Sequence, residues 1–147
     1  MVVNEMTEQE CFEFLRHAAL GRLACSHQDQ PYVVPVTLAY ESNSVYVMST
    51  YGQKIEWMRE NPKVCILVDE LKGESHWTSV IVQGTYLELV EPRYSDELED
   101  AKKLLERRTR WWLNAFAERQ AKSGDTLIEP IFFRVEIASV SGMKASS

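Results

Sequence analysis

The sequence lacks the short motifs that mark the common nucleotide-binding and hydrolytic folds. It contains no G-x-G-x-x-G, no G-x-x-x-x-G-K-[ST] and no G-x-S-x-G, so the usual phosphate loops and the hydrolase nucleophile turn are missing. Its three histidines, His17, His27 and His76, have no metal-ligand spacing with the cysteines or with one another. These absences argue against dinucleotide-binding folds, nucleoside triphosphatases, serine hydrolases and metalloenzymes.

Cysteine is scarce, and long apolar runs are missing. Cys11, Cys25 and Cys65 are odd in number and flanked by apolar residues, which indicates reduced, mostly buried thiols rather than a disulfide framework. No uninterrupted apolar run approaches the ~20 residues that span a bilayer. The first ten residues include three glutamates and no apolar signal segment. We therefore expect a soluble, cytoplasmic protein.

Basic residues are outnumbered, 16 against 22 acidic ones, and the net charge of −6 argues weakly against a nucleic-acid partner. One local exception is R-R-T-R-W-W at 107–112, which combines cations with aromatics as single-strand binders do. The alternative, which we favour, is a helix whose arginines pair with nearby acids while the tryptophans pack inward. The acids expected to pair are Glu97, Glu99, Asp100 and Glu106.

The arrangement of apolar segments predicts one mainly β domain covering residues 1–147. At this length, with 45% hydrophobic residues, a single domain buries a proper core. Five or six strand segments follow one another with hairpin-sized links, which favours an antiparallel meander that closes into a barrel. The expected strands are 22–26, 32–40, 45–48, 63–71, 77–90 and 131–138, with a loose tail from Ser141.

Helices are predicted at three places. Thr7 to Glu10 is a capping-box sequence that starts a helix, for which Gly21 suits the C-terminal cap. Gln53 to Asn61 has helical spacing, with Ile55 and Met58 facing inward. A long C-terminal helix is expected from Ser95 to about Lys122, before the last strand, and a break near 107–110 stays open.

Two residues stand out within the strands. Pro35 cannot donate to a strand ladder, so it belongs at an edge, at a bulge, or where the backbone meets something other than a strand. Gly84 indicates a bulge or the close approach of another group.

The stretch from Val45 to Pro62 organises the chain. It reads as a strand, a hydroxyl-rich turn from Ser49 to Gly52, and a helix that opens with Gln53 and Lys54. The N–H groups of a first helical turn, the hydroxyls of Ser49 and Thr50 and the charge of Lys54 suit a phosphate. The plainer alternative is that Thr50 caps the helix and Lys54 is a solvated surface residue.

Taken together, these segments resemble the pyridoxamine 5'-phosphate oxidase-like family of FMN-binding split barrels. The resemblance rests on the order and spacing of G-R-L-A-C at 21–25, P-Y-V-V-P-V-T at 31–37, V-Y-V-M-S at 45–49, G-Q-K at 52–54, E-N-P at 60–62 and W-T-S-V-I-V-Q-G at 77–84. It covers roughly residues 10–90. It implies an antiparallel six-stranded split barrel and a homodimer with FMN at the subunit interface.

The resemblance also implies the site residues. Val34, Pro35, Val36 and Thr37 would run beside the flavin ring, and Met48 and Ser49 beside the ring and its ribityl-phosphate arm. Gln53 and Lys54, with Thr50, would hold the phosphate, and Ser79 would contact the ring. Trp112 or Phe116 of the other subunit would cover the flavin. The residues expected to bind the cofactor are therefore Val34, Pro35, Val36, Thr37, Met48, Ser49, Thr50, Gln53, Lys54, Ser79 and Trp112.

Two functions remain open. The first is an FMN-dependent oxidoreductase acting on a small molecule. The second is a non-catalytic module that binds a flavin, haem or a deazaflavin on the same fold. The chain looks closest to the short, nitroimidazole-reductase-like branch, which often has His at the position of Met48, and methionine cannot transfer protons.

Overall fold

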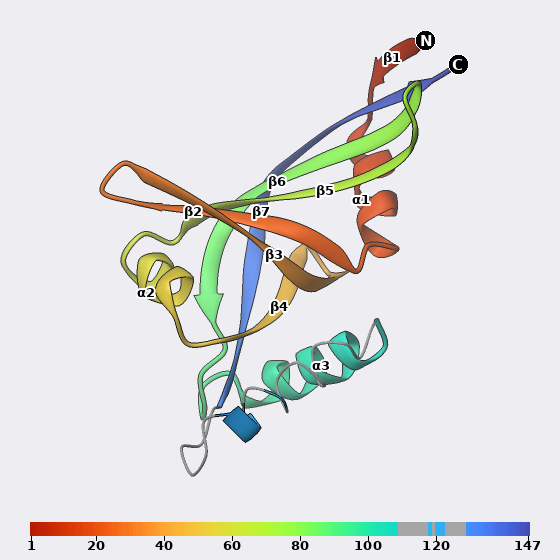
Figure 1. The fold of residues 1–147 in the computed structure, drawn as a ribbon. Coiled ribbons are helices and arrows are strands. Elements are labelled where there is room, and N and C mark those ends of the chain that lie inside the picture. Colours follow the sequence, from red (N-terminus) through yellow and green to blue (C-terminus); the bar gives the residue numbers. More distant parts are fainter. Residues whose placement is uncertain (109–117, 119, 123–128) are drawn as a thin grey trace.

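Most of the described residues lie in strands that wind into a barrel, with helices packed around it (Figure 1). The structure is a computed structural model that describes residues 1–108, 118, 120–122 and 129–147. In chain order its helices and strands are β1 (Val2–Glu5), α1 (Glu8–Arg16), β2 (Leu20–His27), β3 (Gln30–Glu41), β4 (Ser44–Thr50), α2 (Gln53–Glu60), β5 (Lys63–Gly73), β6 (His76–Glu88), α3 (Ser95–Glu106) and β7 (Pro130–Ser146).

The last strand closes the barrel. Strands β2, β3 and β4 form a meander, β5 and β6 form a hairpin, and β2 joins the two groups by pairing with β5. Because β7 pairs with β4 along one edge and with β6 along the other, the ring runs β7-β4-β3-β2-β5-β6. The predicted antiparallel arrangement is confirmed, but the six-strand prediction is corrected: the sheet has seven strands, because β1 extends it beside β7.

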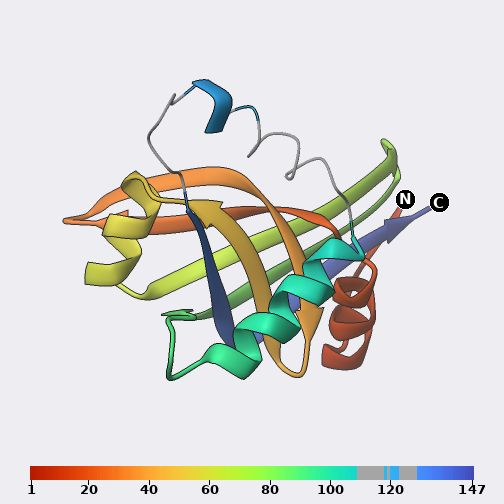
Figure 2. The same ribbon diagram turned by 90° about the horizontal axis from the view of Figure 1, so that it is seen from below.

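Two apolar clusters hold the molecule together. The larger one fills the barrel, and α2 adds Ile55 and Met58 to it, both fully buried as predicted. The smaller one lies between the outer face of the sheet and α3, which crosses β4 and β7 in Figure 2. The buried members of this second cluster are Ala39, Leu89, Leu98, Ala101, Leu105 and Phe132.

The capping box of α1 is confirmed, and the cap predicted for its other end is wrong. The Glu10 amide donates to Thr7 Oγ1 and the Thr7 amide to Glu10 Oε1, both at 3.1 Å. The helix ends at Arg16, with His17 as its cap. Gly21 lies within β2, where a Cβ atom would come within 2.6 Å of a Leu38 side-chain carbon. This glycine permits close packing inside the barrel rather than a helix turn.

The C-terminal predictions need two corrections. The last strand runs from Pro130 to Ser146, well beyond the predicted Ala138, and the tail from Ser141 is not loose. Pairing on both edges explains this, because β1 and β6 bond to opposite sides of the β7 end. The long C-terminal helix is seen as α3 only up to Glu106, and residues 109–117 of the predicted span lie outside the described residues.

The bulge predicted at Gly84 is confirmed. The register between β6 and β7 shifts between Gln83 and Gly84. A Cβ atom at Gly84 would lie 2.2 Å from the Glu136 carbonyl oxygen, so only glycine allows β7 to come this close. Among the helices of the described residues, none has the length and apolar character needed to cross a bilayer.

Candidate functional site

The barrel opens where β3 and β4 part. The two strands pair only from Leu38 to Glu41 on β3 and from Ser44 to Val47 on β4. Before Leu38, β3 pairs with β2 alone, and after Val47, β4 pairs with β7 alone. We call the space between these separated edges the split. Two strand edges therefore face it without a strand partner in the part of the chain that the structure describes.

The β3 edge of the split presents backbone polar groups. In a strand, successive residues direct their N–H and C=O groups to opposite sides. The Leu38 N–H bonds to the Ala19 carbonyl on the β2 side, at 2.9 Å, so Val33, Pro35 and Thr37 direct their groups toward the split. Pro35 therefore occupies a position where no ladder bond is lost. The prediction that it belongs at an edge is confirmed.

Thr37 is the most unusual residue of this edge. It directly precedes Leu38, the first β3 residue that pairs with β4, at the corner of the split, and it is only 3% exposed. Its Oγ1 is buried and has no hydrogen-bond partner among the described residues. Leaving a buried hydroxyl unpaired costs about 1–3 kcal/mol. A ligand that bonds to this hydroxyl would recover that cost, and because Oγ1 is buried, the ligand reaches it only after a small local shift of the neighbouring residues.

The β4 edge is more apolar. Met48 and Thr50 are half-buried, and Ser49 is buried, with its hydroxyl donating to the Thr50 carbonyl at 3.1 Å. Ser49 and Thr50 were expected in a turn, but both belong to β4, because they pair with Ile131 and Pro130 of β7. Strand pairing with a distant segment overrode the local turn pattern.

Helix α2 begins directly beyond the β4 edge. Its N-cap is Gly52, which has no side chain to offer, so the alternative that Thr50 caps the helix is wrong. The first-turn N–H groups lack intrahelical acceptors, as in any helix, and no capping side chain takes one of them here. An anion is favoured at such a terminus. The predicted helix bounds of Gln53 to Asn61 are confirmed to within one residue, since the helix ends at Glu60 and Asn61 is its C-cap.

Gln53 and Lys54 differ in their surroundings. Gln53 is exposed and Lys54 is half-buried. Burial raises the pKa of the Cys25 thiol on β2, and the positive charge of Lys54 lowers it in part. The Lys54 ammonium therefore acts on the interior face of β2 as well as lying in the first turn of α2. Lys54 is therefore less solvated than the plainer alternative expects.

Ser79 does not join the other predicted residues within one chain. It lies on β6 opposite Asp69 of β5, so β2 and β5 separate it from β3. Ser79 lines a hollow of about 270 Å³ between the N-terminal segment and β7, together with Met6 and Met143. Trp112 and Phe116, expected to cover the flavin, lie outside the described residues.

A polar network behind the β4 edge was missed at the sequence level. The Tyr46 hydroxyl donates to Glu97 of α3 at 2.9 Å, and Arg134 of β7 donates to both Glu97 carboxylate oxygens at 2.6 Å. Burial, with the bond to Glu97, raises the pKa of Tyr46 to about 12. The network holds α3 against β4 and β7. Its members lie far apart in the chain, so no local pattern indicates it.

The basic cluster at 107–112 is only partly described. Arg107 is exposed, and the Arg108 guanidinium donates to the Arg16 carbonyl at 2.6 Å. Among the described residues, Glu97 pairs with Arg134 and Glu99 with Lys102, rather than with Arg107 or Arg108 as expected. The remaining residues of the cluster, 109–112, lie outside the described residues.

Comparison with known proteins identifies relatives along the whole chain. The family model described as pyridoxamine 5'-phosphate oxidase matches residues 7–144. An uncharacterised protein of Rhizobium meliloti is 38% identical over 146 residues, which is 99% of this chain and 97% of that protein.

Solved structures show the same architecture. A FAD-binding protein of Mesorhizobium loti is 38% identical and superimposes with a TM-score of 0.81, covering 100% of this chain and 99% of that one. A protein of Bacteroides thetaiotaomicron, whose name refers to 5-nitroimidazole antibiotic resistance, is 17% identical with a TM-score of 0.68, covering 100% of this chain and 93% of that one. The second likeness concerns the fold alone.

Proposed function

The chain belongs to the pyridoxamine 5'-phosphate oxidase family, and on this premise we propose that it is a flavoprotein that binds FMN in the split. The name of the FAD-binding relative from Mesorhizobium loti supports a flavin as the ligand class. The observation in this chain that carries the proposal is the buried, unpaired Thr37 hydroxyl beside an open strand edge.

The chemistry of the split fits a flavin. A flavin ring is flat and apolar, with a polar edge of carbonyl and N–H groups. The β3 edge offers backbone groups of Val33, Pro35 and Thr37, and the β4 edge offers the apolar side chain of Met48. In the proposal the ring lies between these edges, with its polar edge toward Thr37. The phosphate then extends toward Ser49 and the first turn of α2.

Each residue has a stated task in this arrangement. Thr37 and the open backbone groups of β3 orient the ring, while Val34 and Val36 keep β3 bonded to β2. Lys54 and Gln53 hold the phosphate by charge and by hydrogen bonding. When bound, FMN supplies the electron and hydride transfer, and the protein supplies binding, orientation and exclusion of water.

We propose that the working protein is a homodimer. Ser79 reaches a flavin in the split only from a second chain, because β2 and β5 lie between it and β3 of its own chain. A dimer that brings β6 of one chain to the split of the other would complete the site. Sedimentation of the purified protein with and without FMN tests this, and a monomer under both conditions contradicts it.

Cofactor identification tests the proposal directly. Protein expressed without added flavin is purified, its bound small molecule is released by mild denaturation, and the mass distinguishes FMN from FAD. We expect a yellow protein that releases FMN. If the protein releases only FAD, the proposed cofactor becomes FAD, the ligand in the name of the Mesorhizobium loti relative. Native mass spectrometry of FMN-saturated protein that shows no bound flavin overturns the proposal.

Lys54→Ala provides a matched test of the phosphate end. We expect about a tenfold loss of FMN affinity, because one charge-assisted contact contributes roughly 1.5–3 kcal/mol when fully formed. The affinity for riboflavin, which has no phosphate, should change little. Lys72→Ala is the control, because Lys72 is exposed and its ion pair among the described residues is with Glu70 near the β5–β6 turn.

A specific observation favours the second function, a binding module without turnover. The residues along the two edges, from Val34 to Thr37 and from Met48 to Thr50, include no group that ionises near neutral pH. The side chains at these positions therefore cannot act as a general acid or base. Rapid reduction of bound FMN by a reduced nicotinamide, followed by reoxidation with a small acceptor, decides for the oxidoreductase. Bound FMN that does not turn over decides for the module.

A further inference from the structure

The β2–β3 hairpin forms one wall of the split and projects from the barrel. Strand β2 pairs with β5 only from Arg22 to Ala24, so the hairpin beyond Ala24 is paired only with itself. Its two turn residues, Gln28 and Asp29, have left-handed backbone angles, as in a tight hairpin turn. Figure 1 shows the hairpin extending away from the other strands, next to α2.

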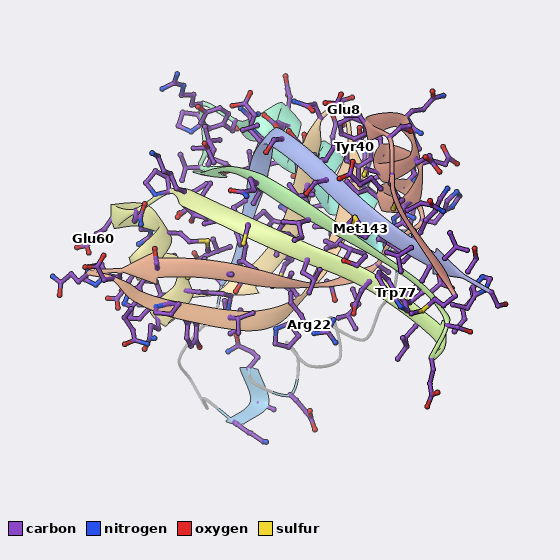
Figure 3. All side chains as sticks on the ribbon, turned by 90° about the horizontal axis from the view of Figure 1, so that it is seen from above. Glu8, Arg22, Tyr40, Glu60, Trp77 and Met143 are labelled. Carbon is purple, nitrogen blue, oxygen red and sulfur yellow. The ribbon has the colours of Figure 1, made fainter. Side chains whose placement is uncertain are left out.

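A set of side chains fastens the hairpin to α2. The His27 ring stacks on the Trp57 indole with centroids 5.5 Å apart, and Tyr32 meets the same indole edge-on at 5.6 Å. His27 Nε2 contacts a carboxylate oxygen of Glu60, which Figure 3 labels at the end of α2 near the hairpin. We call His27, Tyr32, Trp57 and Glu60 the hairpin clamp. It connects the projecting wall of the split to the helix that carries the phosphate-binding turn.

A polar contact lies beside the clamp. Asn61, the last cap of α2, donates to the Ser26 carbonyl and to its hydroxyl, both at 3.2 Å. These bonds involve no group that titrates near neutral pH. Within this region the charge-dependent part of the attachment is therefore the contact between His27 and Glu60.

Helix α2 itself is held firmly by the rest of the barrel. Ile55 and Met58 are fully buried, and Arg59 forms two hydrogen bonds to Glu88 of β6, at 2.9 and 3.0 Å. Beyond Ala24 the hairpin has no partner strand among the described residues, and it is attached to α2 by the clamp and by the Asn61 bonds to Ser26. If the clamp loosens, the hairpin rather than α2 is the part that moves, and the width of the split changes with it.

We propose that His27 is a pH-sensitive positioning residue, whose protonated ring holds the β2–β3 hairpin against α2 and so sets the width of the split. The inference rests on the proposed function, since it concerns how the same site retains its flavin. An imidazolium adds an ionic contact to Glu60 and a cation–π contact to Trp57, and both weaken when the ring is neutral. FMN is therefore held more tightly in mildly acidic than in mildly alkaline solution.

The neighbouring charges do not reverse this direction. Elements β3, β5 and α2 pack against β2. Lys54 of α2 lowers the pKa of Cys25, two residues from His27. The other charged residues close to the clamp in the sequence are Arg59 and Glu60 on α2 and Lys63 at the start of β5, with Asp29 in the hairpin turn. Of these, Glu60 alone contacts the imidazole among the residues that the structure describes. The contact that changes with protonation is thus between a cation and a carboxylate.

The main test is the pH profile of FMN affinity between about pH 5.5 and 8.5. We expect wild-type protein to bind FMN about threefold more tightly at the acidic end, the size of a partly exposed ion pair. His27→Gln should hold the weaker affinity throughout, and His27→Lys, which stays charged, the tighter one. The FMN phosphate also titrates in this range, but it contributes equally to every variant.

His17→Gln is the matched control, because His17 also contacts a glutamate, Glu13, but lies at the end of α1. It should reproduce the wild-type profile. If His27→Gln also reproduces that profile, or if His27→Lys follows His27→Gln, the proposal is overturned.

A second measurement tests the clamp without flavin. Amide hydrogen exchange of residues 26–32 in cofactor-free protein, at one mildly acidic pH, should be faster in His27→Gln than in wild type or His17→Gln. Equal exchange overturns the clamp even where flavin binds. If no flavin binds at all, the proposed function falls, and faster exchange in His27→Gln still supports the clamp.

Discussion

One edge of β3 is hydrogen-bonded along almost its whole length, whereas the other is bonded only over its last four residues. On the β2 side, the pairing runs from Gln30 to Thr37 without a register shift. On the β4 side it stops at Leu38, and the open part carries Pro35 and the buried, unpaired Thr37 hydroxyl. The closed edge supplies stability, and the open edge is available for a ligand. One strand can do both because its backbone N–H and C=O groups point alternately toward β2 and toward the split.

The largest expected effect concerns the closed side of the barrel. Gly84→Ala places a Cβ atom 2.2 Å from the Glu136 carbonyl oxygen, so β6 and β7 must separate. We expect a loss of about 3 kcal/mol in the free energy of unfolding, at the upper end for overpacking, measured by urea denaturation. Gly73→Ala is the control, because nothing lies within 4 Å of its added carbon. Equal losses in the two variants would contradict this description of the closed side.

Proline substitutions compare the two edges of β3 directly. Val34 directs its N–H toward β2, and Val33 directs its N–H toward the split. Val34→Pro should therefore cost about 1–3 kcal/mol more than Val33→Pro, because it leaves a ladder acceptor on β2 without its donor. Both variants introduce the same ring, which makes each the control for the other. A reversed order in urea denaturation would show that the edges are wrongly assigned.

Thr37→Val should separate stability from binding. Valine has nearly the same shape and removes the unpaired hydroxyl, so cofactor-free protein should keep its stability or gain up to about 1 kcal/mol. FMN affinity should fall about tenfold, because one hydrogen bond contributes about 1 kcal/mol. Thermal unfolding and fluorescence titration measure the two quantities. Unchanged affinity would remove Thr37 from the proposed site.

The smallest expected effect concerns the anchor of α2 on the closed side. The hydrogen bond from Arg59 holds the pKa of Glu88 below its usual value, against an opposing effect of burial. Because the folded-state pKa is lowered, the stabilisation is present above the ordinary value of 4.5 and is lost as the pH falls below it.

Glu88→Gln should lower the free energy of unfolding at neutral pH by about 1 kcal/mol or less, since Arg59 is partly exposed. It should also flatten the fall of stability between about pH 5 and pH 3, compared with wild type. Unfolding curves across this range measure both effects. Glu70→Gln is the control, because its contact with Lys72 is longer and more exposed.

Much of the fold was predictable from local patterns. The capping box at Thr7, the helix with buried Ile55 and Met58, and the bulge at Gly84 follow from side-chain spacing and backbone freedom, and each is confirmed. The prediction of a loose tail from Ser141 was wrong, because this segment pairs with β1 and β6, which are remote in the sequence. The prediction that Gly21 caps the first helix was wrong for the same reason, since its close neighbour is Leu38 on another strand.

The candidate site was predictable in part. Pro35 indicated an open edge without any knowledge of its neighbours, because a missing N–H has the same meaning in every fold. The unpaired state of Thr37 was not predictable, since it depends on where β4 leaves β3. The hairpin clamp was not predictable either, because its residues come from three elements, β2, β3 and α2, and the contacts with α2 form only in the folded protein.

Pro31 and Pro35 also bear on solubility. An open strand edge is a template on which another chain can add a strand, and proteins guard such edges with residues that cannot donate. Both prolines occupy positions whose backbone groups point toward the split. Two of the N–H donors that an incoming strand needs are therefore missing from this edge. A small ligand needs only a few of the remaining groups. The edge can thus stay open to a cofactor while resisting aggregation.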